Sequence, residues 1–271
     1  MRHNHAPRRL RLGTGVTVAW TSTGGGCAPP VLLLHAWAEC RRSFDRLLPL
    51  LPETVDGIAI DQRGHGDAES PPGGYALDDF AEDVVAFMDA TDIASAVLVG
   101  SSSGGYVAQQ VAIRNPTRVA GLVLVGSPRT LQARPSFADE IDGLTDPIDT
   151  AWVRKSLTWF PILHPVPQWY IDDRVRDGVR IPARVWRETF DGLIAARPPT
   201  DEGIIDAPTL IVWGDQDEVV PRQHADGLAA AIPRSRLVVY EDTGHLVLWE
   251  IPERLASDVA SFLESLDSWP A

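Results

Sequence analysis

The sequence has a single lysine, Lys155, and only two cysteines and two methionines among its 271 residues. The cysteines, Cys27 and Cys40, have no CxxC spacing and no neighbouring cluster of metal ligands. Two such residues are too few for a disulfide scaffold, so we interpret them as reduced thiols. A lone lysine with no motif around it gives little support to Schiff-base chemistry.

Long apolar runs are also missing. No stretch approaches the roughly 18 apolar residues of a membrane span, and the basic start, residues 1–12, is not followed by the apolar run of a signal peptide. Acidic residues outnumber basic ones by 37 to 24, and the net charge of -13 repels phosphate backbones and anionic lipid. We therefore expect a cytoplasmic protein that binds neither nucleic acid nor membrane. Nothing in the sequence indicates an oligomeric state.

Apolar stretches of strand length alternate with helix-periodic segments through most of the chain. The pattern predicts strands at 16–20, 31–34, 57–60, 96–99, 122–125, 209–213 and 237–240, and helices at 77–91, 104–115, 222–231 and 252–266. Several of the strands are apolar on both faces, which is typical of strands buried between helix layers. The alternation predicts an α/β protein with a mostly parallel sheet wound on both faces.

The alternation stops at Pro128 and resumes near Pro208. A structureless loop from Pro128 to Pro208 would be unusually long for a compact domain. The tryptophans of this segment also need other side chains to pack against. We interpret residues 128–203 as a mainly helical cap inserted into a core that residues 1–127 and 204–271 form. The tryptophans of this segment are Trp152, Trp159, Trp169 and Trp186.

A G-x-S-x-G motif stands between the predicted strand 96–99 and the helix that follows it. Only Ser102, of the three serines in Gly100-Ser101-Ser102-Ser103-Gly104, has glycine two places away on both sides. A strand-to-helix turn this tight strains the residue at its apex, and the glycines let the backbone pass close to its neighbours. The placement predicts a nucleophilic Ser102, and the alternative is a glycine- and serine-rich turn without chemistry.

Three further motifs accompany this turn. His35-Ala36-Trp37 closes an early strand, Asp61-Gln62-Arg63-Gly64-His65-Gly66 has the form D-x-R-G-x-G, and His245 follows the last strand. Together with the serine motif they resemble the α/β-hydrolase family over almost the whole chain. The resemblance implies an α/β-hydrolase fold, with a mostly parallel, doubly wound sheet and a helical cap inserted after the sixth strand. It also implies a serine, acid and histidine triad in that chain order.

The resemblance assigns the roles of base and acid. His245 would take the proton from Ser102 and return it to the leaving group, while a carboxylate after the strand 209–213 orients the imidazole. The family often has G-x-x-D at this strand end, which selects Asp217 over Asp215, because aspartate directly after glycine is commonly a turn residue. Glu218 is a weaker candidate. Some members carry the acid after the sixth strand instead, but residues 126–129 contain no acid.

The resemblance also implies an oxyanion hole, which the backbone N–H groups of Trp37 and Ser103 would form. Ala36 stands where the family usually has glycine, and its Cβ disfavours a positive φ, so the Trp37 donor is the least typical part of the pattern. His35 would support this loop. We expect aromatic side chains to line a pocket for an apolar or aromatic substrate, namely Trp37, Trp152, Trp159, Phe160 and Trp186.

The motifs favour a cofactor-independent serine hydrolase, without a metal, that cleaves a small-molecule carboxylic ester or lactone through an acyl-enzyme. A C–C bond hydrolase of ring-cleavage products is an alternative, since Gly244-His245 and Trp249-Glu250 resemble that branch too. A low-turnover ligand receptor on the same fold is another. Dehalogenases and epoxide hydrolases carry aspartate at the serine position and are disfavoured. C–C hydrolases usually offer a cap arginine to the substrate carboxylate, for which the candidates are Arg154, Arg174, Arg176, Arg180, Arg184 and Arg187.

Overall fold

The computed structural model describes residues 7–132 and 134–266, which build one eight-stranded sheet with the order β1-β2-β4-β3-β5-β6-β7-β8. β2 pairs antiparallel with both β1 and β4, and every other neighbouring pair is parallel. The strands are β1 (Arg8–Arg11), β2 (Thr17–Ser22), β3 (Cys27–Leu34), β4 (Val55–Asp61), β5 (Ala96–Ser101), β6 (Val119–Val125), β7 (Thr209–Gly214) and β8 (Ser235–Tyr240).

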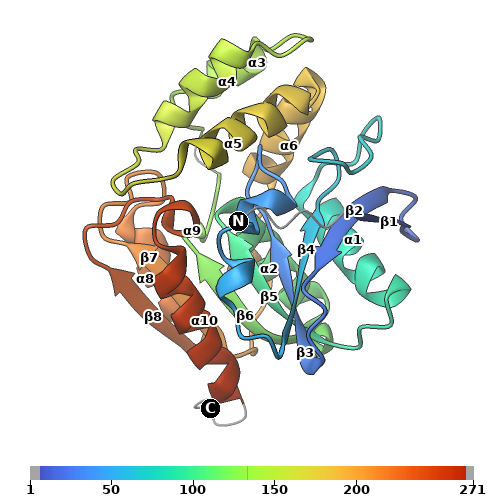
Figure 1. Ribbon diagram of the computed structural model, residues 1–271, viewed down its shortest axis with the longest axis vertical. Coiled ribbons are helices and arrows are strands. Elements are labelled where there is room, and N and C mark those ends of the chain that lie inside the picture. Colours follow the sequence, from blue (N-terminus) through green and yellow to red (C-terminus); the bar gives the residue numbers. More distant parts are fainter. Residues whose placement is uncertain (1–6, 133, 267–271) are drawn as a thin grey trace.

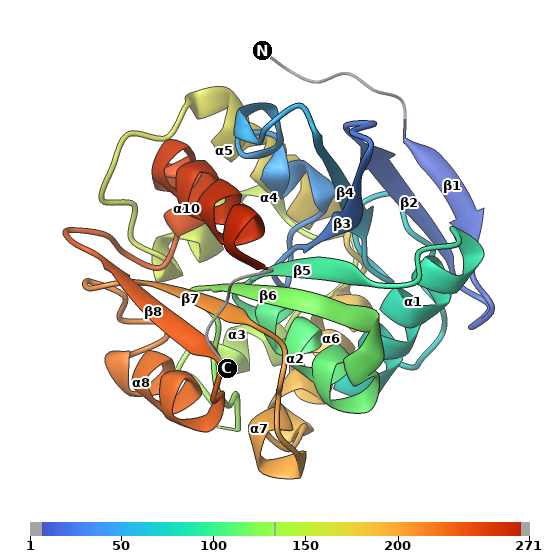
Figure 2. The ribbon, with the colours of Figure 1, turned by 90° about the horizontal axis from the view of Figure 1, so that it is seen from below.

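Helices cover both faces of the sheet. α1, α2 and α8 lie on one face and α10 on the other (Figure 2). Between β6 and β7 the described residues form α3–α7 and no strand, and α3–α6 gather at the top of the molecule in Figure 1. The helices are α1 (Leu77–Ala90), α2 (Ser103–Arg114), α3 (Ala138–Asp142), α4 (Thr150–Ser156), α5 (Gln168–Arg180), α6 (Ala183–Ala195), α7 (Pro199–Glu202), α8 (Arg222–Ala231), α9 (Val247–Glu250) and α10 (Pro252–Ser265).

Successive residues of the central strands supply two separate hydrophobic cores. In β3, Leu32 and Leu34 face the core that contains α1 and α2, whereas Val31 and Leu33 face the core that contains α10. Because side chains alternate between the two faces of a strand, a strand covered on both faces must be apolar throughout. This is why the sequence predicts these strands as continuous apolar runs, and the mostly parallel sheet is confirmed.

The sequence pattern missed β1. Three of its four residues are exposed, and it pairs only with β2, at the edge of the sheet. Backbone hydrogen bonds of an antiparallel edge pair hold such a strand without an apolar face, so a polar Arg8–Arg11 segment gives no burial signal.

Buried ion pairs join α5 to the core. Asp177 is fully buried and forms ion pairs with Arg42 and with Arg174, whose guanidinium lies 2.7 Å from Oδ2. The thiol of Cys40 donates to the same Oδ2 at 3.1 Å, and burial raises the pKa of this free thiol well above its usual range. Cys40 is thus a buried structural residue; the prediction for the Cys27 thiol lies outside the described side chains.

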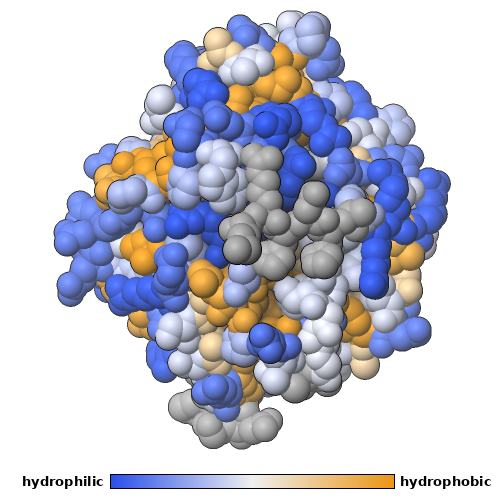
Figure 3. Space-filling model, in the orientation of Figure 1, coloured by the Kyte–Doolittle hydropathy of each residue, from blue (hydrophilic) through white to orange (hydrophobic). Residues whose placement is uncertain are grey.

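Polar and charged side chains cover most of the face in Figure 3, with apolar ones confined to patches. Among residues 7–132 and 134–266, no helix is both long and apolar enough to cross a bilayer.

The order of the strands creates a switch point at the carboxyl ends of the central strands β3 and β5. β4 follows β3 on one side and β5 lies on the other, so the chain reverses its direction of travel across the sheet between these strands. Loops that leave the carboxyl ends of β3 and β5 therefore diverge, and ligands of open α/β sheets bind at such a switch point.

The turn from β5 into α2 passes through Ser102, whose backbone has φ 49° and ψ -120°. Such a conformation costs a non-glycine residue about 1–3 kcal/mol. Neighbouring backbone lies so close to Gly100 and Gly104 that neither position has room for a Cβ atom. A Cβ on Gly104 would lie 2.1 Å from the Leu34 carbonyl oxygen, and one on Gly100 would lie 2.4 Å from the Gly105 nitrogen. The glycines thus let α2 pack directly against β3 and β5.

We predict that Gly104→Ala lowers the free energy of unfolding by about 1–3 kcal/mol or more, because its Cβ meets backbone that cannot move aside. Urea unfolding measures the loss. Gly73→Ala is the matched control, since a Cβ there meets nothing within 4 Å. Equal stability of the two variants would contradict the close packing.

Candidate active site

The hydroxyl of Ser102 meets the imidazole of His245 at the carboxyl edge of the sheet. Its Oγ lies 3.1 Å from His245 Nε2, and His245 Nδ1 lies 2.8 Å from Asp217 Oδ2. Three residues from three separate loops thus form one hydrogen-bonded chain. The structure brings together the three side chains that the sequence predicts as nucleophile, base and acid.

Asp217 is held as an acceptor on both oxygens. Its Oδ1 accepts the backbone N–H groups of Val219 and Val220, at 2.9 and 2.8 Å, while Oδ2 faces His245. Both oxygens of Asp217 therefore have hydrogen-bond partners, and the one that faces His245 lies within hydrogen-bond distance of Nδ1.

The two other acids of this loop have different surroundings. Asp215 Oδ1 accepts the backbone N–H of Thr243 at 3.2 Å, so it holds the loop after β8 against the loop after β7. Glu218 is exposed at the cavity. Of the three acids, only Asp217 lies within hydrogen-bond distance of His245.

The backbone N–H of Trp37 points at the start of α2, where it donates to Ser103 Oγ at 2.7 Å. The two predicted oxyanion donors are therefore adjacent. The expected difficulty at Ala36 does not arise, because positive φ falls on Ala38 instead (65°) and Ala36 is not among the described residues with positive φ. Alanine is thus compatible with this loop.

Neutral, buried groups support the Trp37 loop. His35 Nε2 accepts the backbone N–H of Gln62 at 3.0 Å, and the Gln62 side-chain amide donates to the His35 carbonyl at 2.7 Å. Burial lowers the pKa of His35 well below its usual value. The imidazole of His35 is therefore uncharged, and its hydrogen bond with the Gln62 backbone supports this loop.

A cavity of about 860 Å³ opens onto Ser102 and His245. Four of the five predicted aromatic residues line it, namely Trp37, Trp159, Phe160 and Trp186. Trp152, contrary to expectation, is not a lining residue. It packs edge-on against Trp159 and Trp186, with ring centroids 5.8 and 5.3 Å apart, so it supports the wall from behind. Phe137, Phe190 and Trp249, which the sequence did not predict as pocket residues, also line the cavity.

The inserted helices and their loops reach both ends of this site. Phe160 stacks on the His245 ring, with centroids 5.7 Å apart, and Trp37 packs edge-on against Trp186 of α6 at 5.0 Å. Glu250 Oε2 accepts the N–H groups of Leu163 and His164, at 3.0 and 2.7 Å, which ties this loop to α9. Residues of the insertion thus touch both the imidazole and the Trp37 loop.

Two charged residues of the cavity wall carry little sequence signal. Glu39 is 9% exposed, its Oε1 accepts the indole N–H of Trp249 at 2.9 Å, and burial raises its pKa. Arg174 is 3% exposed and is the one arginine among the six candidates that lines the cavity. Glu39 contacts Trp249 of α9 and Arg174 of α5 contacts Ser43, and local sequence does not reveal such long-range contacts.

Among residues 7–132 and 134–266, no group of three or more histidine, cysteine, aspartate or glutamate side chains is arranged to hold a metal ion.

Comparison with known proteins gives relatives of several activities. The chain is 31% identical over 244 residues to the dihydrolipoyllysine-residue acetyltransferase component of the acetoin cleaving system of Cupriavidus necator, covering 86% of this chain but only 62% of that protein. It is 29% identical to 2-hydroxymuconate semialdehyde hydrolase from a Pseudomonas species, covering 95% of this chain and 94% of that one.

Solved structures agree on the fold. A hydrolase from Pseudomonas aeruginosa superposes with a TM-score of 0.84 at 26% identity, covering 96% of this chain and 99% of that one. An enol-lactonase from Burkholderia xenovorans, at 21% identity and a TM-score of 0.81, covers 95% and 100%. The profile of the alpha/beta hydrolase family matches residues 31–259. The chain therefore belongs to the alpha/beta hydrolase family, and its relatives support a hydrolase.

Proposed function

We propose that the protein is a cofactor-independent serine hydrolase that cleaves a carboxylic ester or lactone. The observation that carries the proposal is the chain of contacts from Ser102 Oγ through His245 to Asp217, at 3.1 and 2.8 Å. A hydroxyl, an imidazole and a buried carboxylate in this order are the parts of a nucleophilic triad. The substrate is a small molecule that fits beneath residues 128–203, which act as a cap.

The first half of the reaction forms an acyl-enzyme. Ser102 Oγ attacks the substrate carbonyl carbon while His245 Nε2 takes the hydroxyl proton, and Asp217 stabilises the imidazolium that results. The N–H groups of Trp37 and Ser103 donate to the carbonyl oxygen and stabilise its negative charge. This oxygen would then take the place of Ser103 Oγ as acceptor for the Trp37 N–H, or share that N–H with it. The tetrahedral species then expels the alkoxide, which takes the proton back from His245.

The second half releases the acid. His245 removes a proton from a water molecule, whose oxygen attacks the acyl carbon, and Ser102 Oγ leaves with the proton that His245 returns. With a lactone the alkoxide stays attached to the acyl chain, so one hydroxy acid is the product. With an ester the alcohol leaves first.

The cavity supports an apolar or aromatic acyl or alcohol group. Aromatic rings line much of it, and Phe137 and Trp159 stack at 4.3 Å in its wall. A volume of about 860 Å³ lies within the range of small-molecule pockets and exceeds what an acetyl group needs. Each methylene that such a wall removes from water is worth about 0.8 kcal/mol.

A C–C bond hydrolase is the second candidate, favoured by the position of Arg174 in the cavity wall and by the 2-hydroxymuconate semialdehyde hydrolase relative. Against it, Arg174 donates to Ser43 Oγ and Asp177 Oδ2, at 3.2 and 2.7 Å, which leaves little of the guanidinium for a substrate carboxylate. Assaying a vinylogous diketone beside phenyl esters and lactones separates the two. Faster turnover of the diketone would replace the ester proposal.

We predict that Ser102→Ala lowers kcat on p-nitrophenyl esters by about 10⁴-fold or more, because no other group supplies the nucleophile. A fluorophosphonate should label the wild-type protein at Ser102, as mass spectrometry of the peptides would show. Ser101→Ala is the matched control and keeps most of the activity. Failure of the wild-type protein to react with the probe or with any ester would favour the low-turnover receptor.

We predict that Asp217→Asn lowers kcat by about 10³- to 10⁴-fold, because an amide can hold the imidazole in the wrong tautomer and cannot balance its charge. Steady-state kinetics on the same ester measure the change. Asp215→Asn, which alters only the acceptor for Thr243 N–H, keeps kcat within about tenfold of the wild type. The reverse ranking would move the role of acid to Asp215.

We predict that esters of bulky apolar acids have kcat/KM about tenfold or more above the acetate, and that Trp159→Ala reduces this preference. A series of p-nitrophenyl esters of increasing acyl length gives the ratio. Trp20→Ala is the control, because Trp20 packs against Phe87 far from the cavity wall. A flat series in the wild type would reject the apolar substrate.

A further inference from the structure

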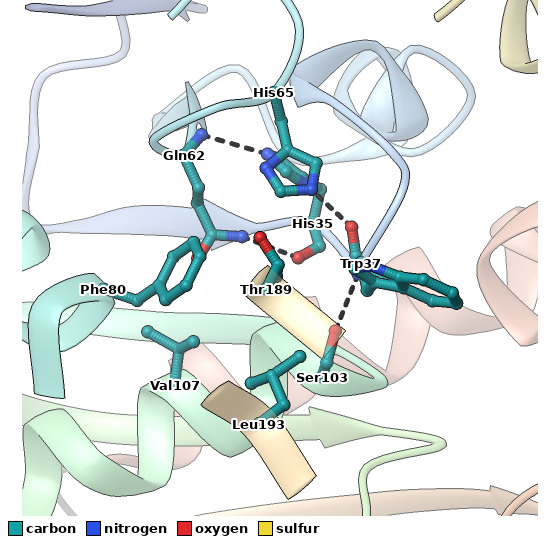
Figure 4. A pocket seen from close by; sticks show the side chains of 10 residues that line it. His35, Trp37, Gln62, His65, Phe80, Ser103, Val107, Thr189 and Leu193 are labelled. Atoms are coloured by element: carbon teal, nitrogen blue, oxygen red, sulfur yellow. Dashed lines mark hydrogen bonds between the residues drawn. The ribbon is translucent and has the colours of Figure 1, made fainter. Parts of the chain in front are cut away.

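A second, much smaller cavity lies directly behind the Trp37 loop. It leaves about 10 Å³ in which the centre of a water molecule can move, enough room for one. Figure 4 shows that Gln62, His65 and Thr189 converge on it, from the turn after β4 and from α6. It is separate from the large cavity, although Ala36, Trp37, Ser103 and Leu193 line both.

Three residues that line this small cavity each have a side-chain polar atom with no hydrogen-bond partner among the described residues. These atoms are Gln62 Oε1, His65 Nε2 and Thr189 Oγ1, and all three are buried from solvent. An unpaired buried polar atom costs about 1–3 kcal/mol, and buried polar groups in folded proteins are seldom left unpaired. Three of them around one space call for a shared partner.

The hydrogens around the cavity can be assigned from the neighbouring contacts. His65 Nδ1 lies 2.8 Å from the Arg63 carbonyl and so carries the proton, while burial lowers the pKa of this histidine to about 4 and keeps it neutral. His65 Nε2 is therefore an acceptor. The Gln62 amide nitrogen donates to the His35 carbonyl at 2.7 Å, which makes Oε1 an acceptor as well. Thr189 has a hydroxyl proton to give.

We propose that this cavity binds one structural water molecule. Water donates two hydrogen bonds and accepts from a hydroxyl, which matches two acceptors, His65 Nε2 and Gln62 Oε1, and one donor, Thr189. An ammonium ion would bring a charge into a buried site that has no carboxylate among its lining residues. A metal ion would find no carboxylate among the residues that line the cavity.

The water links the inserted helices to the Trp37 loop. Thr189 lies on α6, and Gln62 holds His35 through two hydrogen bonds, at 3.0 and 2.7 Å. His35 Nδ1 in turn contacts the Ala36 carbonyl at 2.8 Å, next to Trp37. A water shared by Thr189 and Gln62 therefore continues a chain of hydrogen bonds from α6 to the backbone that presents the Trp37 N–H.

A crystal structure at better than about 2 Å resolution tests the site directly. We expect one ordered water within about 3.2 Å of Gln62 Oε1, His65 Nε2 and Thr189 Oγ1. Thr189→Ser keeps the hydroxyl and retains the water. An empty cavity in the wild type, or direct pairing of Thr189 Oγ1 with a protein group, would overturn the proposal.

The stability of two threonine variants provides an independent test with opposite expected signs. Thr200 Oγ1 is also buried without a partner, but Thr200 lines neither cavity. Removing an unpaired hydroxyl is neutral or stabilising, whereas removing one that holds a water destabilises its other partners. We expect Thr189→Val to lower the thermal midpoint by about 2–6 °C and Thr200→Val to leave it unchanged or raise it. A Thr189→Val protein as stable as the wild type would contradict the water.

Discussion

The strained backbone of Ser102 is the constraint on which the rest of the site depends. Its φ of 49° turns the chain from β5 into α2 without an intervening loop and aims the hydroxyl out of the sheet edge. The strain is tolerated because glycine at 100 and 104 lets three backbone segments approach within distances that exclude a Cβ. The strand order then supplies the space, since the loop after β3 leaves on the other side of the switch point. Strain at one residue and reversal of the winding direction thus create the same crevice.

Aromatic side chains of the residues between β6 and β7 pack against the site and also line the large cavity. Trp186 packs against Trp37 and also lines the large cavity, and Phe160 both lines it and stacks on His245. The same rings therefore both pack against their neighbours and form the cavity wall. Trp152, which only packs, shows that aromatic composition identifies the cluster but not the members that face the cavity.

Local patterns predicted most of the core strands and located their carboxyl ends, but β3 (Cys27–Leu34) and β6 (Val119–Val125) begin before the predicted stretches 31–34 and 122–125. Buried parallel strands read as apolar runs, and Asp217 was separable from Asp215 because aspartate after glycine favours a turn role, which the contact between Asp215 and Thr243 matches. The misses have physical reasons. β1 is polar because an edge strand needs only backbone partners, and the positive φ at Ala38 rather than Ala36 depends on how the loop packs. The neighbours of Glu39 and Thr189 in space are far away in the sequence, so no local pattern of residues predicts these contacts.

The two sides of the proposed catalytic site are held by different kinds of interaction. On the base side, the buried carboxyl group of Asp217 accepts two backbone N–H groups and faces the imidazole of His245. On the oxyanion side, support comes from neutral groups, because burial keeps His35 and His65 uncharged. A charge on these histidines would disrupt the contacts that they make as acceptors, such as the one between His35 Nε2 and Gln62 N–H. Because their pKa values are lowered below the usual range of histidine, the scaffold of the oxyanion donors stays uncharged at a pH where an ordinary histidine would gain a proton. In the proposed mechanism His245 would exchange protons, while His35 and His65 hold the neighbouring loop in place through their hydrogen bonds and packing.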